Sequence, residues 1–130
     1  MIVCDTNILI EFYKNTPNVV QEMQVIGYTH LAISAITQAE LYFGAFDKAE
    51  LRKIKTHLSL LTVFPVTISI SHRFVELMET YCLSHKLSLP DALIAANSLI
   101  HQHELYTLNQ KDFRFIPEIS FYQPVTYSAP

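Results

Sequence analysis

The chain has 130 residues, of which half are hydrophobic and 16% are charged, with a net charge of −3 and a mean hydropathy of +0.22. This length favours one domain that folds without a disulfide or metal staple. The acidic balance excludes a protein that coats nucleic acid through bulk positive charge. No stretch approaches the ~18 apolar residues of a membrane span, so we expect no membrane association. The apolar composition indicates either a well-filled core or a large interface with a partner or a second copy.

The two cysteines, Cys4 and Cys82, lie in apolar runs and have no cysteine nearby in the sequence. This is typical of reduced core thiols. No signal peptide is visible, because Asp5 interrupts the first apolar run almost at once. We therefore expect a cytoplasmic protein.

Short apolar runs alternate along the chain with segments of helical period. The first run, residues 2–4, is a predicted buried strand, and capping chemistry at residues 5–7 opens a helix. The later predicted elements are helix 17–26, opened by Pro17 and closed by Gly27, strand 30–34, helices 37–46 and 49–61, strand 63–68, helix 71–85, a helix from 89 to about 103, strand 105–108 and a last strand 119–122. The pattern predicts a single α/β domain over residues 1–124, with a central parallel sheet of about five strands flanked by helices on both faces. We expect residues 125–130 to be a frayed tail.

Three acidic residues stand out by their positions. Asp5 directly follows the first strand, Glu40 lies one turn into the helix after the second strand, and Asp91 lies in the first turn of a later helix. Each alone is explained by the helix dipole, which stabilises a carboxylate in a first helical turn. In parallel sheets, however, ligands bind beyond the carboxyl ends of the strands, at the point where the strand order reverses. Gly44 follows Glu40 by four residues and permits close backbone approach, so we expect Glu40 to point into a cleft.

Three carboxylates gathered at one sheet edge would repel each other. At ~6 Å and an effective dielectric constant of ~20, each pair costs roughly 3 kcal/mol, which a bound cation would offset. Ligands that are all oxygen select hard metals such as Mg²⁺ or Mn²⁺. Such ions support phosphodiester hydrolysis by generating hydroxide and neutralising charge on the phosphorane oxygens.

Four sequence blocks occur in one order along nearly the whole chain. They are Asp5-Thr6-Asn7, Ile36-Thr37-Gln38-Ala39-Glu40-Leu41 with Gly44, Leu89-Pro90-Asp91-Ala92-Leu93-Ile94-Ala95-Ala96, and Thr107-Leu108-Asn109-Gln110-Lys111-Asp112-Phe113. Together they resemble the PIN-domain family, and in particular the VapC-type toxin ribonucleases of toxin–antitoxin pairs. The block from Pro90 to Ala96 is the most distinctive.

This resemblance implies a PIN-like fold and a Mg²⁺- or Mn²⁺-dependent endoribonuclease whose metal ligands are Asp5, Glu40 and Asp91. Many members carry a fourth acid where this chain has Asn109, and Asp112 follows three residues later. We therefore count Asp112 with the catalytic residues and Asn109 as a supporting residue. Thr6 would support the site by bonding a metal ligand or a phosphate through its hydroxyl or its backbone N–H.

The resemblance also implies partners. Relatives of this length act on RNA as homodimers and are silenced by a cognate antitoxin protein. We expect the antitoxin to bind along the first helices, around Phe12 and Tyr13, and to place an arginine or lysine near Asp5 and Asp91. The basic residues at 52, 53 and 55 are interpreted as a solvated helix face, with contact to the RNA backbone as the alternative.

Other functions remain open at this stage. A phosphatase of the haloacid-dehalogenase type also has an acid after its first strand, but it needs a second aspartate at position 7, where this chain has Asn7. A response-regulator receiver needs adjacent acids that are absent. A third alternative is a catalytically silent PIN-fold module that binds RNA or protein.

Overall fold

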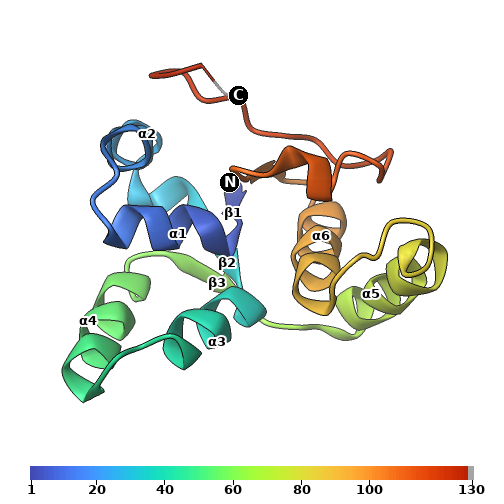
Figure 1. The fold of residues 1–130 in the computed structure, drawn as a ribbon, viewed down its shortest axis with the longest axis horizontal. Coiled ribbons are helices and arrows are strands. Elements are labelled where there is room, and N and C mark those ends of the chain that lie inside the picture. Colours follow the sequence, from blue (N-terminus) through green and yellow to red (C-terminus); the bar gives the residue numbers. More distant parts are fainter. Residues whose placement is uncertain (129–130) are drawn as a thin grey trace.

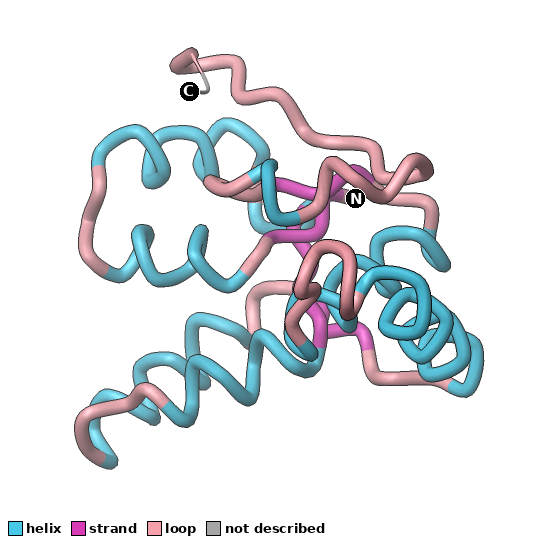
Figure 2. Tube along the Cα trace, turned by 45° about the vertical axis from the view of Figure 1, so that its right-hand side comes forward, coloured by secondary structure: helices cyan, strands magenta, loops and turns pink. Residues whose placement is uncertain are grey.

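A parallel sheet forms the centre of the structure, a computed structural model that describes residues 1–128 (Figures 1 and 2). Within the described residues its four strands are β1 (Ile2–Cys4), β2 (Leu31–Ser34), β3 (Thr62–Phe64) and β4 (Glu104–Tyr106). Their order is β3-β2-β1-β4, and each neighbouring pair is parallel. The strand order reverses between β1 and β4, so a site is expected beyond the carboxyl ends of these two strands.

Six α-helices connect the strands of the described part of the chain. They are α1 (Thr6–Tyr13), α2 (Pro17–Ile26), α3 (Ala35–Phe43), α4 (Lys48–Leu58), α5 (Ile68–Tyr81) and α6 (Leu89–His101), with short 3₁₀ turns η1 (Tyr28–His30) and η2 (Gln110–Asp112). Side chains at the capping positions begin five of these helices by accepting a backbone N–H, and they are Asp5, Ser34, Asp47, Thr67 and Ser88. No helix among the described residues has the length and apolar character needed to cross a membrane.

Two hydrophobic clusters lie on opposite faces of the sheet, because successive strand residues point to opposite sides. Val3 and Leu105 pack with residues of α5 and α6. Their neighbours Cys4 and Tyr106 pack with residues of α1, α2 and α4. Figure 1 shows α5 and α6 together on one side and α1, α2 and α4 on the other. The predicted fold class, a single α/β domain with helices on both faces, is confirmed.

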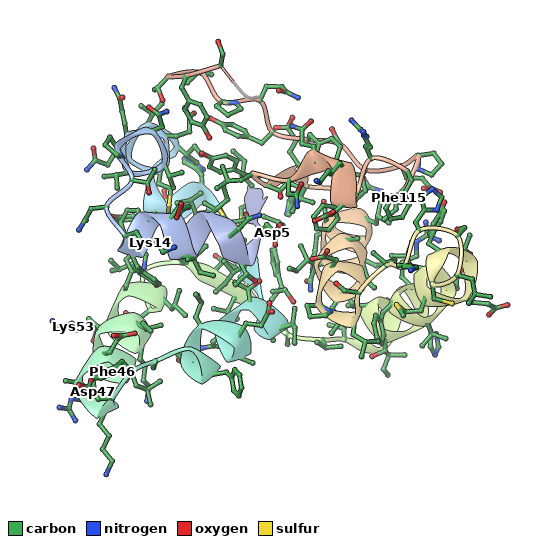
Figure 3. The ribbon with its side chains drawn as sticks, viewed as in Figure 1. Asp5, Lys14, Phe46, Asp47, Lys53 and Phe115 are labelled. Atoms are coloured by element: carbon green, nitrogen blue, oxygen red, sulfur yellow. The ribbon has the colours of Figure 1, made fainter. Side chains whose placement is uncertain are left out.

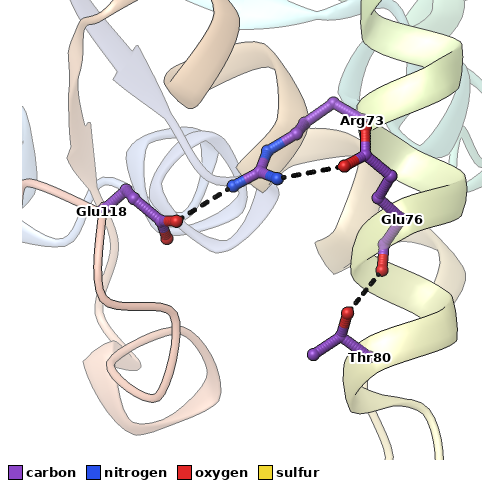
Figure 4. A network of polar contacts seen from close by, with 4 residues as sticks. All are labelled: Arg73, Glu76, Thr80 and Glu118. Carbon is purple, nitrogen blue, oxygen red and sulfur yellow. Dashed lines mark hydrogen bonds and ion pairs between the residues drawn. The ribbon is translucent and has the colours of Figure 1, made fainter.

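Arg73 ties α5 to the segment that follows η2 (Figure 4). Its guanidinium lies 3.3 Å from the carboxylate of Glu118 and 3.6 Å from that of Glu76. Such partly exposed pairs stabilise a fold by less than about 1 kcal/mol. Because of these two pairs, the positive charge of Arg73 is already balanced by carboxylates of the chain itself.

The predicted element boundaries differ from the structure mainly where apolar runs cross from one element into the next. Predicted strand 63–68 ends at Phe64, because Thr67 caps α5 and Ile68 already belongs to that helix. Predicted strand 119–122 forms only a single parallel bridge, between Leu105 and Phe121. Helix 17–26, with Pro17 in its first turn and Gly27 at its end, agrees with the prediction.

The chain after Phe121 forms a C-terminal strap, residues 122–127, that is fastened to α2. Glu22 on α2 is fully buried and accepts hydrogen bonds from the Tyr122 hydroxyl, from the Val125 N–H at 3.1 Å, and from the Thr126 N–H and hydroxyl at 2.9 and 2.6 Å. The hydroxyls of Tyr106 and Tyr127 lie 2.7 Å apart. Figure 1 shows this segment crossing from the α6 side toward α2. The prediction of a frayed tail is therefore wrong for residues 125–127, and residues 129–130 lie outside the described residues.

Burial of Glu22 raises the pKa of its carboxyl, but the hydrogen bonds from the strap outweigh burial and hold the pKa below its usual range. The ionised form is thus the one that fits the folded state. Stability from this group is fully present above the ordinary glutamate pKa of about 4.3. It is lost as the pH falls through the lowered pKa of the folded state.

We predict that Glu22→Gln lowers the free energy of unfolding by about 1–3 kcal/mol, because an NH₂ group would face strap donors that have lost their acceptor. Urea unfolding measures this change. Glu79→Gln removes the same charge from an exposed position on α5 and should change stability by less than about 0.5 kcal/mol. The difference in unfolding free energy between wild type and Glu22→Gln should narrow below pH ~4.3, where the unfolded chain binds a proton at Glu22 before the folded protein does. If the difference in unfolding free energy between wild type and Glu22→Gln does not depend on pH, the ionised carboxylate of Glu22 is not what holds the strap.

Candidate active site

Asp5 lies at the centre of the site, where β1 passes into α1. It caps α1, and its backbone N–H donates to the carbonyl of Tyr106 at the end of β4 at 2.8 Å. Each carboxylate oxygen accepts one short hydrogen bond: Oδ1 from the Thr6 N–H at 2.7 Å and Oδ2 from the Thr107 hydroxyl at 2.8 Å. The side chain is only 6% exposed. The bond from Thr107 joins β4 to β1 across the point where the strand order reverses.

Thr6 links Asp5 to Glu40 on α3. Its hydroxyl donates to Oε1 of Glu40 at 2.8 Å and accepts from the hydroxyl of Thr37, which lies 3.0 Å away. Thr37 is fully buried and precedes Glu40 by three residues, so the two share a helix face. The N–H and the hydroxyl of Thr6 thus hold two different carboxylates.

Asp91 and Asp112 enter from the opposite side and line one small pocket together. Asp91 lies in the first turn of α6, where its N–H donates to the hydroxyl of the capping residue Ser88 at 3.3 Å. Asp112 ends the turn η2, and its Oδ2 accepts from the side-chain amide of Asn109 at 2.5 Å. Asn109 therefore orients Asp112, an acid three residues away in the sequence.

Burial and neighbouring carboxylates raise the pKa of two of these acids, Asp5 and Asp91. Burial raises the pKa of Asp5, and the charges of Glu40 and Asp112 add to this, against the hydrogen bonds from Thr107 and Thr6. Burial also raises the pKa of Asp91 to about 6, together with the charges of Asp5, Asp112 and Glu40. None of the four acids is within ion-pair distance of a lysine or arginine among the described residues. The result is a concentrated, unbalanced negative charge, here called the acidic centre.

The donors of the acidic centre are all oxygen atoms, a set that fits a hard divalent ion better than zinc. No three acidic, histidine or cysteine side chains in the described part of the chain are arranged to hold one ion directly. Mg²⁺ does not require such a cage, because it keeps several water ligands and is commonly bound through one or two carboxylates. The acidic centre thus fits a largely hydrated ion.

One argument from the sequence is wrong, and two residues of the site were not anticipated. A Cβ on Gly44 would meet only the carbonyls of Glu40 and Leu41, at 3.6 and 3.8 Å, so no second backbone of the described chain lies against this glycine. Glu40 does line a groove, as expected, and Gly44 lines it too. Thr37 and Thr107 hold the acidic centre together, yet the sequence analysis gave neither a role. Thr107 directly follows β4 as Asp5 follows β1, and this common position at strand ends is the signal that could have identified it.

The chain matches the PIN domain family over residues 2–118. It therefore belongs to the PIN-domain family.

Solved structures with a similar fold narrow this class. A toxin–antitoxin complex from Klebsiella pneumoniae shares 31% identity and a TM-score of 0.79, over 98% of this chain and 99% of that one. VapBC-1 from nontypeable Haemophilus influenzae shares 27% identity and a TM-score of 0.78, over 94% and 97%. VapBC2 from Rickettsia felis, bound to a DNA fragment from its promoter, shares 26% identity and a TM-score of 0.79, over 94% and 98%. Comparison with curated protein sequences gave no match. The resemblance to PIN domains of the VapC type is confirmed.

We predict that Asp91→Asn raises the free energy of unfolding of the metal-free protein by about 1–2 kcal/mol at neutral pH, because it removes a crowded charge. The pKa of Asp91 is raised from 3.8 to about 6, so the folded state binds this proton more tightly than the unfolded state. Wild-type stability should therefore fall as the pH rises from about 4 to 6 and stay lower above that. Denaturant unfolding across this range would reveal the difference.

Asp47→Asn is the matched control, because Asp47 is an exposed acid that caps α4 by accepting the Glu50 N–H at 2.8 Å. That variant should not gain stability, because asparagine caps helices about as well as aspartate. A loss of stability in Asp91→Asn would identify Asp91 as a helix-capping acid like Asp47 and would contradict crowding at the acidic centre.

Proposed function

We propose that this protein is a Mg²⁺- or Mn²⁺-dependent endoribonuclease that hydrolyses RNA phosphodiester bonds, and that it is the toxin of a toxin–antitoxin pair. The observation that carries the proposal is the acidic centre: four carboxylates gathered where the strand order reverses, with no cation paired to them among the described residues. Membership of the PIN-domain family supports a nuclease. We also propose that it acts in the cytoplasm.

Asp5, Glu40 and Asp91 are the proposed metal ligands, which would hold the ion directly or through its bound water molecules. Each oxygen of Asp5 accepts one hydrogen bond from the described residues and keeps a lone pair for a metal or its water. The hydroxyl of Thr6 fixes one oxygen of Glu40 and leaves the other oxygen without a described partner. A bound divalent ion would supply a hydroxide nucleophile and neutralise charge on the phosphate. Thr6 and Thr107 would hold these carboxylates in place through neutral donors, so no positive charge of the chain would compete with the metal.

Asp112 is the proposed fourth acid, acting from an outer position. Its carboxylate is held by Asn109 and adds to the negative charge at Asp5 and Asp91. Outer carboxylates of this kind orient the water molecules and ligands around a metal.

We predict that the purified protein cleaves RNA with Mg²⁺ or Mn²⁺ and stops when EDTA removes the metal. Asp5→Asn, Glu40→Gln and Asp91→Asn should each remove most of the activity, whereas Asp112→Asn should slow cleavage by about 10- to 100-fold. Cleavage of a labelled RNA on a denaturing gel measures these rates. Glu79→Gln, an exposed acid on α5, is the control and should cleave as wild type does. Full activity in EDTA would overturn the mechanism, and no cleavage with either metal would favour the silent binding module.

A groove between α1, α3 and α4 provides a site for the antitoxin. Its volume is about 710 Å³, and it is lined by Ile10, Phe12, Tyr13, Lys14, Glu40, Leu41, Gly44, Glu50, Lys53, Ile54 and His57. An apolar groove of this kind fits the apolar face of an amphipathic helix. The groove reaches Glu40, so an arginine or lysine carried by the bound partner could enter the acidic centre near Asp5 and Asp91. The toxin–antitoxin complexes among the similar structures support such a partner. The homodimer stays a prediction.

We predict that Ile10→Asp weakens antitoxin binding by at least tenfold, because it places a charge in the apolar wall of the groove. Ile10 is 41% exposed, so its replacement should not disturb the core. The measurement is co-purification and titration with the cognate antitoxin protein. Val75→Asp, at a position on α5 that is 57% exposed, is the control and should bind as wild type does. An equal loss of antitoxin affinity in Ile10→Asp and Val75→Asp would exclude this groove as the antitoxin site.

A further inference from the structure

The positive charges of the chain are unevenly distributed around the acidic centre. Of the nine lysine and arginine residues, five lie on α4 or at the end of α1, and they are Lys14, Lys48, Arg52, Lys53 and Lys55. Arg73 is engaged by Glu76 and Glu118 (Figure 4). The remaining three, Lys86, Lys111 and Arg114, lie in the loop before α6 and in the segment around η2. Two of these three line a pocket that adjoins the acidic centre.

This basic pocket has a volume of about 190 Å³ and is lined by His85, Lys86, Leu87, Ser88, Asp91, Lys111, Asp112 and Phe115. It shares Asp91 and Asp112 with the acidic centre, so the two are continuous. Figure 3 shows Phe115 on the opposite side of Asp5 from Lys14 and Lys53, two residues of the apolar groove. The acidic centre thus lies between an apolar groove on one side and a basic pocket on the other.

The two lysines of the basic pocket are available to a ligand. Both are exposed, and neither is within 4.0 Å of a carboxylate among the described residues. Lys86 has a φ of +52°, a left-handed conformation that costs a residue with a Cβ about 1 kcal/mol. Backbone geometry alone would favour glycine at this position.

An aromatic surface borders the same pocket. The rings of His85 and Phe115 are stacked, with centroids 4.2 Å apart and planes 16° from parallel, and Tyr81 lies 5.0 Å from Phe115. Phe115 covers one face of the imidazole, and His85 is exposed, which leaves the other face for a ligand. Flat rings beside lysines are the combination that proteins use to bind single-stranded RNA, since bases stack on the ring while the cations bind phosphate.

We propose that the basic pocket holds a nucleotide that adjoins the scissile phosphate of the RNA, with Lys86 and Lys111 on its phosphate and His85 stacked on its base. This inference rests on the ribonuclease function proposed above. A polyanion that approaches four carboxylates is repelled unless cations lie next to them, and these two lysines are placed to offset that repulsion. Lys14 and Lys53 line the groove on the other side, but Lys14 is paired with Glu11 at 3.8 Å, whereas neither lysine of the basic pocket is paired with a carboxylate among the described residues.

The test separates charge contacts from stacking by the dependence of binding on salt. Fluorescence anisotropy of a short labelled single-stranded RNA is measured with Asp5→Asn protein, which binds without cutting. Adding Lys86→Gln and Lys111→Gln should reduce the slope of log Kd against log salt concentration by about 1.4, at about 0.7 for each phosphate contact in single strands. Adding His85→Ala should weaken binding roughly tenfold and leave the slope unchanged.

Matched controls exclude bulk electrostatics and misfolding. Lys48→Gln with Lys55→Gln removes the same charge from exposed positions on α4 that line neither the groove nor the basic pocket, and it should leave the slope unchanged. His72→Ala, at an exposed histidine on α5, should bind as the parent does. Thermal melts of each variant establish that it is folded.

Two failures are distinguishable. Suppose that wild-type protein with Mn²⁺ cuts RNA. The basic pocket is then not the RNA site if the variant of Lys86 and Lys111 keeps the salt slope of its parent, or if the slope falls as much in the α4 control. If wild-type protein cuts no RNA, the proposed ribonuclease function fails instead.

Discussion

The acidic centre depends on hydrogen bonds from uncharged donors to carboxylates that repel one another. Thr107 and the N–H of Thr6 hold Asp5, and the hydroxyl of Thr6 holds Glu40. A lysine or arginine in any of these places would also have fixed the acids, but it would have cancelled the charge that attracts a divalent ion. Neutral donors fix the geometry and leave the charge uncompensated. The position of β4 beside β1 meets the same requirement, because it brings Thr107 to Asp5.

Much of the fold and the outline of the site could be predicted from the sequence, for local reasons. Asp5 follows a short apolar run, and a residue in that place lies at the carboxyl end of a strand wherever the strand sits in the sheet. Asp91 follows Pro90 within a helix start, which fixes its position in the first turn. Both inferences use only neighbouring residues, and the structure places both side chains at the acidic centre.

The features that were missed depend on contacts between distant parts of the chain. Glu22 looks like an ordinary acid on an amphipathic helix until residues a hundred positions later bring it four hydrogen-bond donors. Threonine at a strand or helix end is common, so the sequence does not reveal that Thr107 reaches Asp5. Pairing of residues 119–122 with β4 stops after one bridge, and the next residues turn toward Glu22 instead. No local sequence pattern indicates whether these residues pair with β4 or bind Glu22.

The place of β4 in the strand order also determines when the acidic centre can form during synthesis. β1 spans residues 2–4, yet its neighbour β4 comes from residues 104–106, so most of this sequence separates the two strands. A nascent chain that stops before this point has Asp5 without Thr107 and lacks Asp112 altogether. Contacts of such long sequence separation form late in folding. The acidic centre therefore cannot be complete until the chain has been synthesised through Asp112.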